Sequence, residues 1–291
     1  MRVLYFGDPQ AAVGLIKDGI HLVGIIHGRR GGLGWQHLFK LMKSRSLAMP
    51  RWIRPDLNSP EIQAQLMCTQ PDLIVSGFYP ELIPEPILNL APGVNVHPSD
   101  LPQWRGPDPV VHTILSGQET SAICVHALTA ELDSGPVFKR MEVKVPRRAD
   151  AGTLSLVLEE QGAALLVSVV KAWCTSGPIR GLDQVGEPTW APQYTDEWWE
   201  IDWRRSAIEV DRFVRAAHPY PGAFTGIGNE LLVIQKASVA AAGAFEVLTP
   251  GTPYVRKGEL FIRCGQDALA IEWLKLGRRK LRGTEFADLL Q

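Results

Sequence analysis

Short apolar strands alternate with helical segments along the first 175 residues, and this alternation constrains the fold more than any other feature. The strands expected at 2–6, 21–27 and 72–77 are almost wholly apolar, which is typical of strands buried on both faces of a sheet. Consecutive strands joined by helices form a parallel sheet with right-handed crossovers. We therefore predict an α/β fold with a mostly parallel, Rossmann-like sheet in this part of the chain.

Two side chains that donate hydrogen bonds come together at the end of a strand expected at 94–97. The sequence there alternates apolar and polar residues, so Asn95 and His97 lie on one face of the strand. Pro98 cannot donate a backbone hydrogen bond and sits where the strand should stop. Open α/β sheets bind their ligands beside strand ends, which makes this position a candidate site.

A carboxylate in a later turn completes the candidate site. Asp133 follows His97 by 36 residues, in a Leu-Asp-Ser-Gly turn after a second strand. A carboxylate beside an imidazole raises its basicity and fixes its tautomer. An amide, an imidazole and a carboxylate suit acyl transfer to an amine, and no Ser or Cys nucleophile is needed if the acyl donor is activated. The simpler interpretation makes His97 a strand-end histidine and Asp133 an ordinary turn carboxylate.

A second, smaller domain follows a stretch that has no periodicity. Residues 176–200 are rich in Gly, Pro and Trp, and we interpret them as a linker between domains at 1–175 and 201–291. Ser206 and Glu209 form a capping box that opens a helix. Short strands, separated by Gly and Pro, are then expected at about 230–235, 244–248, 253–256, 259–264 and 268–273. This pattern predicts a small β-barrel.

Composition sets bounds on partners and location. A formal net charge of −1 gives no electrostatic case for a polyanionic partner. We find no apolar run long enough to span a bilayer and no apolar core of a signal peptide, so we expect no membrane partner. The cysteines show no paired spacing, which predicts reduced thiols, a cytoplasmic location and no metal site. They are Cys68, Cys124, Cys174 and Cys264.

The motif around the candidate site resembles the folate-dependent formyltransferases. Asn95-x-His97 is followed by Pro-Ser-x-Leu-Pro-x-x-Arg-Gly and then by Leu-Asp-x-Gly, as in that family. Its members include methionyl-tRNA formyltransferases, the formyltransferase domain of the lipid A aminoarabinose pathway, and amino-sugar and hydroxyornithine formyltransferases. The resemblance implies transfer of a formyl group from 10-formyltetrahydrofolate, the co-substrate, to an amine. It also implies that Asn95, His97 and Asp133 are the catalytic residues, and that the C-terminal domain is OB-like.

The resemblance further implies which loops contact the folate. They are the loop after the strand at 72–77, the segment after His97, and the turn before Asp133, and an apolar lip there suits a flat heterocycle. Packing of the loop aromatics on the core is the alternative for any one residue. The implied folate contacts are Phe78, Tyr79, Leu82, Ser99, Asp100, Leu101, Pro102, Thr129, Ala130, Glu131 and Leu132. Two further histidines are interpreted as structural, His112 on a helix surface and His126 within a strand.

The acceptor amine is the least specified part of the expected reaction. The tRNA enzymes carry a longer basic loop after the second strand, whereas this chain has only Arg29–Gly34, which we interpret as a mobile surface loop rather than a phosphate site. Nucleic-acid affinity depends on Lys and Arg that neutralise phosphates, and the charges here are balanced. We favour a small-molecule or carrier-bound amine over initiator tRNA. An inactive folate- or tRNA-binding protein is the alternative of another class.

Overall fold

The computed structural model describes residues 1–28, 33–227 and 230–289, and most of the loop expected at Arg29–Gly34 falls outside these ranges. The chain forms two compact units. The N-terminal unit consists of Met1–Pro109, Thr120–Lys144 and Leu156–Ala191, and the C-terminal unit of Val110–Glu119, Val145–Ser155 and Pro192–Gln291. The domain boundaries expected near 175 and 201 stay predictions.

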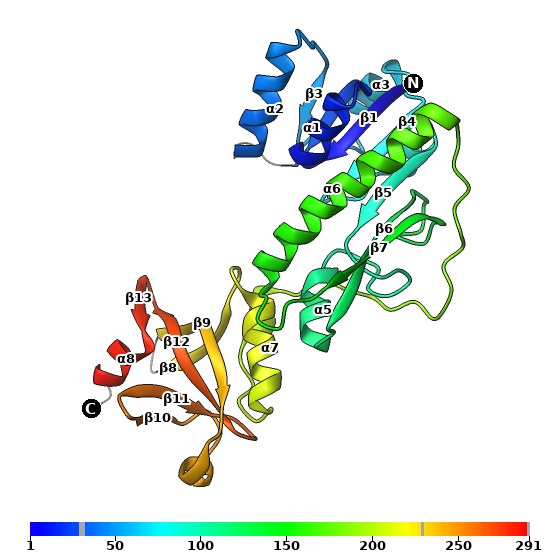
Figure 1. Ribbon diagram of the computed structural model, residues 1–291. Helices are drawn as coiled ribbons and strands as arrows, with labels where there is room; N and C mark the ends of the chain where they lie inside the picture. The colour runs from blue at the N-terminus through cyan, green and yellow to red at the C-terminus, as the bar shows by residue number, and fades with distance from the viewer. Residues whose placement is uncertain (29–32, 228–229, 290–291) are drawn as a thin grey trace. The chain divides into compact units, whose positions relative to one another are not determined.

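A seven-stranded sheet forms the centre of the N-terminal unit (Figure 1). Its strands are β1 (Arg2–Gly7), β2 (His21–His27), β3 (Arg51–Ile53), β4 (Leu73–Gly77), β5 (Gly93–His97), β6 (Thr120–Ala127) and β7 (Val137–Lys144). They lie in the order β3-β2-β1-β4-β5-β6-β7. The pairs from β3 to β5 are parallel, whereas β5–β6 and β6–β7 are antiparallel. The predicted mostly parallel α/β fold is therefore confirmed.

Helices cover both faces of this sheet. They are α1 (Pro9–Lys17), α2 (Leu33–Ser44), α3 (Pro60–Cys68), α4 (Glu85–Leu88) and α6 (Ala151–Ser176). In α6, the residues from Leu156 onward belong to this unit. On one face, Leu66 of α3 and Ile87 of α4 pack with Phe6 of β1 in a buried cluster. On the other face, Gly14 of α1 lies against Val167 of α6.

Helix α6 differs from the expectation that no apolar run is long enough to span a bilayer. Its 26 residues are long and apolar enough to cross a membrane by length and composition alone, so the prediction that no run reaches this length was wrong. The structure also gives the reason for its apolar composition. Leu166 and Val170 are fully buried, and Leu166 lies close to Gly77 of β4. The helix therefore contributes to the core of the N-terminal unit.

A separate antiparallel sheet forms most of the C-terminal unit, as the second part of the predicted fold class required. Its order is β10-β11-β12-β9-β8, with β13 paired to β12. The strands are β8 (Ala223–Ile227), β9 (Glu230–Ala240), β10 (Pro253–Arg256), β11 (Glu259–Arg263), β12 (Ala268–Leu276) and β13 (Arg279–Arg282). The helical segments are α5 (Pro109–Ser116), η1 (Asp196–Trp199), α7 (Ala207–Ala217), η2 (Gly243–Val247) and α8 (Gly283–Leu289). The expected capping box opens α7.

Local predictions in this unit were partly wrong. The strand expected at 244–248 is the 3₁₀ segment η2, in which Phe245 stacks on Tyr254 with 4.2 Å between ring centroids. The strands β8 and β13 and the helix α8 were not expected. In the case of β13, the sequence RKLR is too polar to show an alternating pattern. His112 is not a surface residue: it is buried and stacks on Tyr194 at 5.2 Å.

Candidate active site

Strand pairing brings an amide and an imidazole together. In the antiparallel β5–β6 pair, Asn95 lies directly opposite His126, and their Nδ2 and Nε2 atoms are 3.1 Å apart. His97 is the last residue of β5, and its Nε2 lies 2.8 Å from the backbone oxygen of Trp104 in the following loop. His97 and His126 are both buried, with ring centroids 6.3 Å apart.

Asp133 lies between the two imidazole rings. Its Oδ2 is 3.5 Å from Nδ1 of His97, and its Oδ1 is 3.5 Å from Nε2 of His126. The backbone N–H of Gly106 donates to Oδ2 at 2.9 Å. Asp133 has a φ of +51°, a left-handed conformation that Asp tolerates better than most residues. The structure thus brings Asn95, His97 and Asp133 into one cluster, and His126 links the amide to the carboxylate.

The backbone carbonyls around the site assign the ring protons. A carbonyl oxygen only accepts, so Nε2 of His97 donates to Trp104 O and Nδ1 of His126 donates to Ala127 O at 2.8 Å. In neutral rings, Nδ1 of His97 and Nε2 of His126 then carry no proton. Both of these nitrogens face Asp133, so a proton added to either ring would lie beside the carboxylate.

Burial and the neighbouring groups set the charges in the cluster. Burial lowers the pKa of His97, and His126 adds to this, while the Asp133 charge and the Trp104 carbonyl oppose it. Burial alone would raise the pKa of Asp133. The neighbouring imidazoles, His126 most of all, and the Gly106 N–H outweigh that effect and lower the pKa to about 2. At neutral pH the site therefore holds an ionised carboxylate beside a neutral His97 ring.

The loop after β4 places its aromatic residues partly in the core. Phe78 has a φ of +56°, and its ring fits against Gly162 of α6. Tyr79 packs edge-on against Phe6, with ring centroids 5.5 Å apart. Leu82 is instead 72% exposed. Of the expected folate contacts in this loop, Leu82 offers the most free apolar surface.

The other expected folate contacts lie in two hydrogen-bonded turns. Asp100 forms a bidentate ion pair with Arg140, at 2.6 and 2.7 Å. Ser99 donates to Gln103 O, and Thr129 donates to Glu131 O. A hollow of about 250 Å³ is lined by Asp100, Leu101, Pro102, Gln103, Val185, Gly186 and Glu187. Ala130 and Leu132 complete the second turn, and Leu132 is 36% exposed.

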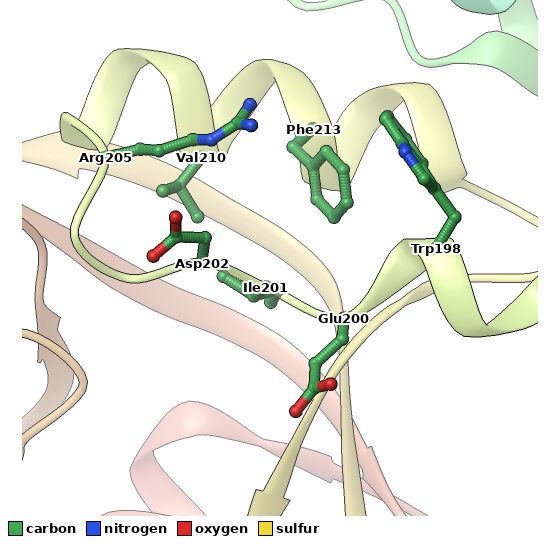
Figure 2. Close-up of a pocket in the computed structure, with 7 residues that line it drawn as sticks. All are labelled: Trp198, Glu200, Ile201, Asp202, Arg205, Val210 and Phe213. Carbon is green, nitrogen blue, oxygen red and sulfur yellow. The ribbon is translucent and has the colours of Figure 1, made fainter.

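A smaller hollow, of about 90 Å³, lies in the C-terminal unit and contains none of the expected site residues. Figure 2 shows Phe213 and Val210 extending from α7 toward Ile201, with Trp198 beside them. Asp202, Arg205 and Glu200 complete the lining. We assign no part of the predicted chemistry to it.

Two residues near Asp133 were not predicted as part of the site. His126 was interpreted as structural, although an antiparallel pairing of β5 and β6 would have placed it near Asn95. Gln184 donates from Nε2 to the backbone oxygens of Asp133, at 2.7 Å, and Gly135, at 2.9 Å. It lies in the segment interpreted as a linker, and no sequence signal identifies it.

Two family models and several curated relatives match the chain. The family model described as formyl transferase matches residues 36–170, and the model of the formyl transferase C-terminal domain matches residues 194–290. A methionyl-tRNA formyltransferase of Chloroflexus aurantiacus is 33% identical, over 98% of this chain and 95% of that protein. The chain belongs to the formyl transferase family. The family expected from the motif is thus confirmed.

Other proteins similar to this formyl transferase family member differ in the substrate or ligand that their names state. A methionyl-tRNA formyltransferase of Caldanaerobacter subterraneus is 30% identical, over 98% of this chain and 96% of that protein. The structure of an N-formyltransferase of Helicobacter canadensis, in complex with folinic acid and dTDP-3-aminofucose, has a TM-score of 0.67 at 12% identity. That match covers 92% of this chain and 98% of the other, and it shows the fold alone.

Proposed function

We propose that this protein transfers a formyl group from 10-formyltetrahydrofolate to the nitrogen of an acceptor amine. The observation that carries the proposal is the buried cluster in which Asp133 lies 3.5 Å from both His97 and His126, with Asn95 bonded to His126. It offers an amide donor, a base and a carboxylate at one strand end. The folate supplies an already activated formyl group, so the chain needs no nucleophile of its own.

The residues of the surrounding loops fit a folate. A flat heterocycle needs apolar contacts and a few polar groups that fix its orientation. Leu82 and Leu132 expose apolar side chains, while the hollow beside Asp100 is lined by both polar and apolar residues. The ion pair with Arg140 fixes the position of the Asp100 carboxylate beside this hollow.

In the proposed mechanism His97 moves the proton. Its neutral ring takes a proton from the attacking amine and returns it to the folate nitrogen that leaves. Because Nε2 donates to Trp104 O in the described state, proton uptake at Nε2 requires this carbonyl to withdraw and the ring proton to move to Nδ1. Asp133 then accepts a hydrogen bond from Nδ1 and stabilises the imidazolium.

Asn95 stabilises the negative charge that develops on the formyl oxygen. An amide N–H aimed at this oxygen acts where water is excluded, which strengthens its electrostatic effect. One N–H of Asn95 is engaged by His126, at 3.1 Å, and the second N–H remains to point at substrate. His126 thereby fixes the plane of the amide.

For the acceptor, we infer a small-molecule or carrier-bound amine, and we place the reaction in the cytoplasm. The named ligand of the Helicobacter canadensis enzyme is an aminosugar nucleotide, which has this chemistry. The four cysteines are unpaired, as expected of a reducing compartment.

Initiator tRNA is the second candidate acceptor, and one observation favours it. The hairpin of β12 and β13 carries five exposed cations, Lys275, Arg278, Arg279, Lys280 and Arg282. None of them forms an ion pair with another residue of the described ranges, and Lys280 and Arg282 lie over the ring of Trp273. Unpaired cations beside an aromatic ring suit a phosphate backbone. The curated relatives named above are also methionyl-tRNA formyltransferases.

The proposed function is tested by supplying 10-formyltetrahydrofolate with a panel of amines and measuring tetrahydrofolate formation. The panel contains methionylated initiator tRNA, a nucleotide-linked aminosugar and an N-hydroxyornithine. We expect turnover with one of them, and His97→Ala should lower it by a factor on the order of 100 or more. His21→Ala, at an exposed histidine of β2, is the matched control. Wild-type turnover by His97→Ala would remove His97 from its assigned role.

A further inference from the structure

A segment at Leu182–Ala191, here termed the strap, is fixed to the N-terminal unit at two points. Leu182 and Val137 exchange backbone hydrogen bonds of 2.9 and 2.7 Å. At the other end, Arg105 donates its backbone N–H to Thr189 O at 2.9 Å and accepts from the Ala191 N–H at 2.7 Å. The strap has no regular secondary structure between these points, yet both ends are held.

Between these points, Gln184 joins the strap to the turn that carries Asp133. Its Nε2 donates to Asp133 O at 2.7 Å and to Gly135 O at 2.9 Å. Its Oε1 accepts from Nη2 of Arg105 at 2.8 Å and from Nε at 3.2 Å. These four hydrogen bonds use both donors and both lone pairs of the Gln184 amide. Only one orientation of the amide, with Nε2 toward the turn and Oε1 toward Arg105, satisfies all of them.

The turn at Asp133 needs such support. A left-handed conformation costs an L residue about 1–2 kcal/mol, and Asp133 adopts one with a φ of +51°. Two residues later, Gly135 passes so close to Ala127 O that a Cβ atom would lie 2.1 Å from it. Backbone of this kind persists only where its surroundings over-determine it. Arg105 and Gly106 hold the turn from two sides, one through Gln184 and the other by bonding the carboxylate directly.

We propose that Gln184 is a positioning residue, which sets the placement of the Asp133 carboxylate against the His97 ring. Its hydrogen bonds go to Arg105 and to the backbone oxygens on either side of Ser134, and through these oxygens it acts on the turn. The expected effect of Gln184 on catalysis rests on the proposed function, whereas its effect on the geometry of the His97–Asp133 pair does not.

Two substitutions separate the hydrogen bonds that Gln184 donates to the turn from those that it accepts from Arg105. Gln184→Met keeps the length of the side chain and removes all four hydrogen bonds. Gln184→Glu keeps an acceptor for Arg105, but it replaces the amide donor with a carboxylate oxygen that faces the two backbone carbonyl oxygens. We expect both to lower kcat by roughly 10- to 100-fold, since a displacement of about 1 Å costs that much, with less change in KM for the folate. Asp183→Asn, at the exposed neighbour in the strap, is the control and should leave kcat unchanged.

A second measurement does not depend on turnover. The titration of His97 is followed by NMR in protein with labelled histidine, with His97→Ala used for assignment. Because the Asp133 charge raises the pKa of His97, displacement of the carboxylate in Gln184→Met should lower that pKa. The other groups facing the ring are His126 and the Trp104 carbonyl, which the substitution does not touch.

The outcomes distinguish the two proposals. Wild-type kcat in Gln184→Met, or an unchanged His97 titration in folded Gln184→Met, overturns the positioning role. A lower melting temperature with unchanged His97 titration also overturns it, because Gln184 would then be only structural. If the wild-type protein shows no formyl transfer, the proposed function fails, and the titration still decides whether Gln184 places Asp133.

Discussion

At the residue scale, His126 has a role that a strand histidine does not ordinarily have. Its Nε2 lies 3.1 Å from the amide nitrogen of Asn95 and 3.5 Å from Oδ1 of Asp133, and the residue is 1% exposed. The Asn95 amide is only half-buried, and an amide that loses its partner rotates to find another one in the protein or in water. The orientation of Asn95 therefore depends on His126.

Replacing His126 should impair turnover more than binding. We expect His126→Leu to lower kcat by a factor on the order of 10, because the Asn95 amide loses the partner that orients it. His126→Gln offers an amide oxygen near the same place and should restore part of the rate. Steady-state kinetics of the two variants check this. Equal activity of His126→Leu and the wild-type protein would contradict it.

The charge state of His97 predicts the pH dependence of the reaction. The pKa of His97 is lowered from 6.5, chiefly by burial, so the ring is already neutral at pH 7. We expect kcat/KM to be level near neutral pH and to fall as the pH drops through this lowered pKa. In Asp133→Asn the fall should begin at lower pH, because the carboxylate that raises the pKa of His97 is gone. A rate that rises on acidification would contradict a base at this position.

At the element scale, helix α6 fits against the site through a glycine. A Cβ atom at Gly162 would lie 2.6 Å from Cζ of Phe78 and 3.2 Å from Cγ2 of Val96. Phe78 is an expected folate contact and Val96 belongs to β5. The absence of a side chain at this helix position therefore determines where the loop after β4 lies.

Gly162→Ala tests this packing. Alanine favours a helix over glycine by about 1 kcal/mol, but overpacking costs about 1–3 kcal/mol. Because the Phe78 ring is confined beside Val96, we expect the cost of overpacking to exceed the gain in helix propensity. The free energy of unfolding should then fall, and the KM for the folate should rise. Gln161→Ala, at the exposed neighbouring position, is the control for helix propensity. Greater stability of Gly162→Ala with unchanged KM would show that the ring moves freely.

At the scale of the whole molecule, the even charge balance conceals a local concentration of cations. The chain carries a net charge of −1, yet the hairpin segment 275–282 contains five cations and no acidic residue. Lys275 lies directly opposite Lys280 in the β12–β13 pair, an arrangement that destabilises the strands. A bound anion would remove this repulsion.

Charge reversal in the hairpin separates the two candidate acceptors. With initiator tRNA, Arg279→Glu combined with Lys280→Glu should lower kcat/KM by roughly 10-fold or more and weaken its dependence on salt, because phosphate contacts are lost. With a small amine the same protein should keep wild-type kcat/KM. Measurement of both acceptors at two salt concentrations checks this, and an equal loss with both would assign the hairpin to stability instead.

Much of this fold and part of its site could be read from residue patterns. Apolar strands alternating with helices predicted the parallel sheet, because periodicity reports which face of an element is buried. The Asn95-x-His97 spacing placed two side chains on one strand face, and the turn motif identified Asp133. The domain boundaries, the catalytic roles and the folate contacts stay predictions.

Only the tertiary structure decided which groups surround Asp133. His126 reaches Asn95 because β5 and β6 pair in one particular register, and Gln184 reaches Asp133 across 51 residues of chain. Neither contact follows from periodicity, since strand register and the path of an irregular segment depend on packing between distant parts of the chain. The sequence by itself determined most of the elements and the reactive residue types, and folding determined how the reactive residues are held.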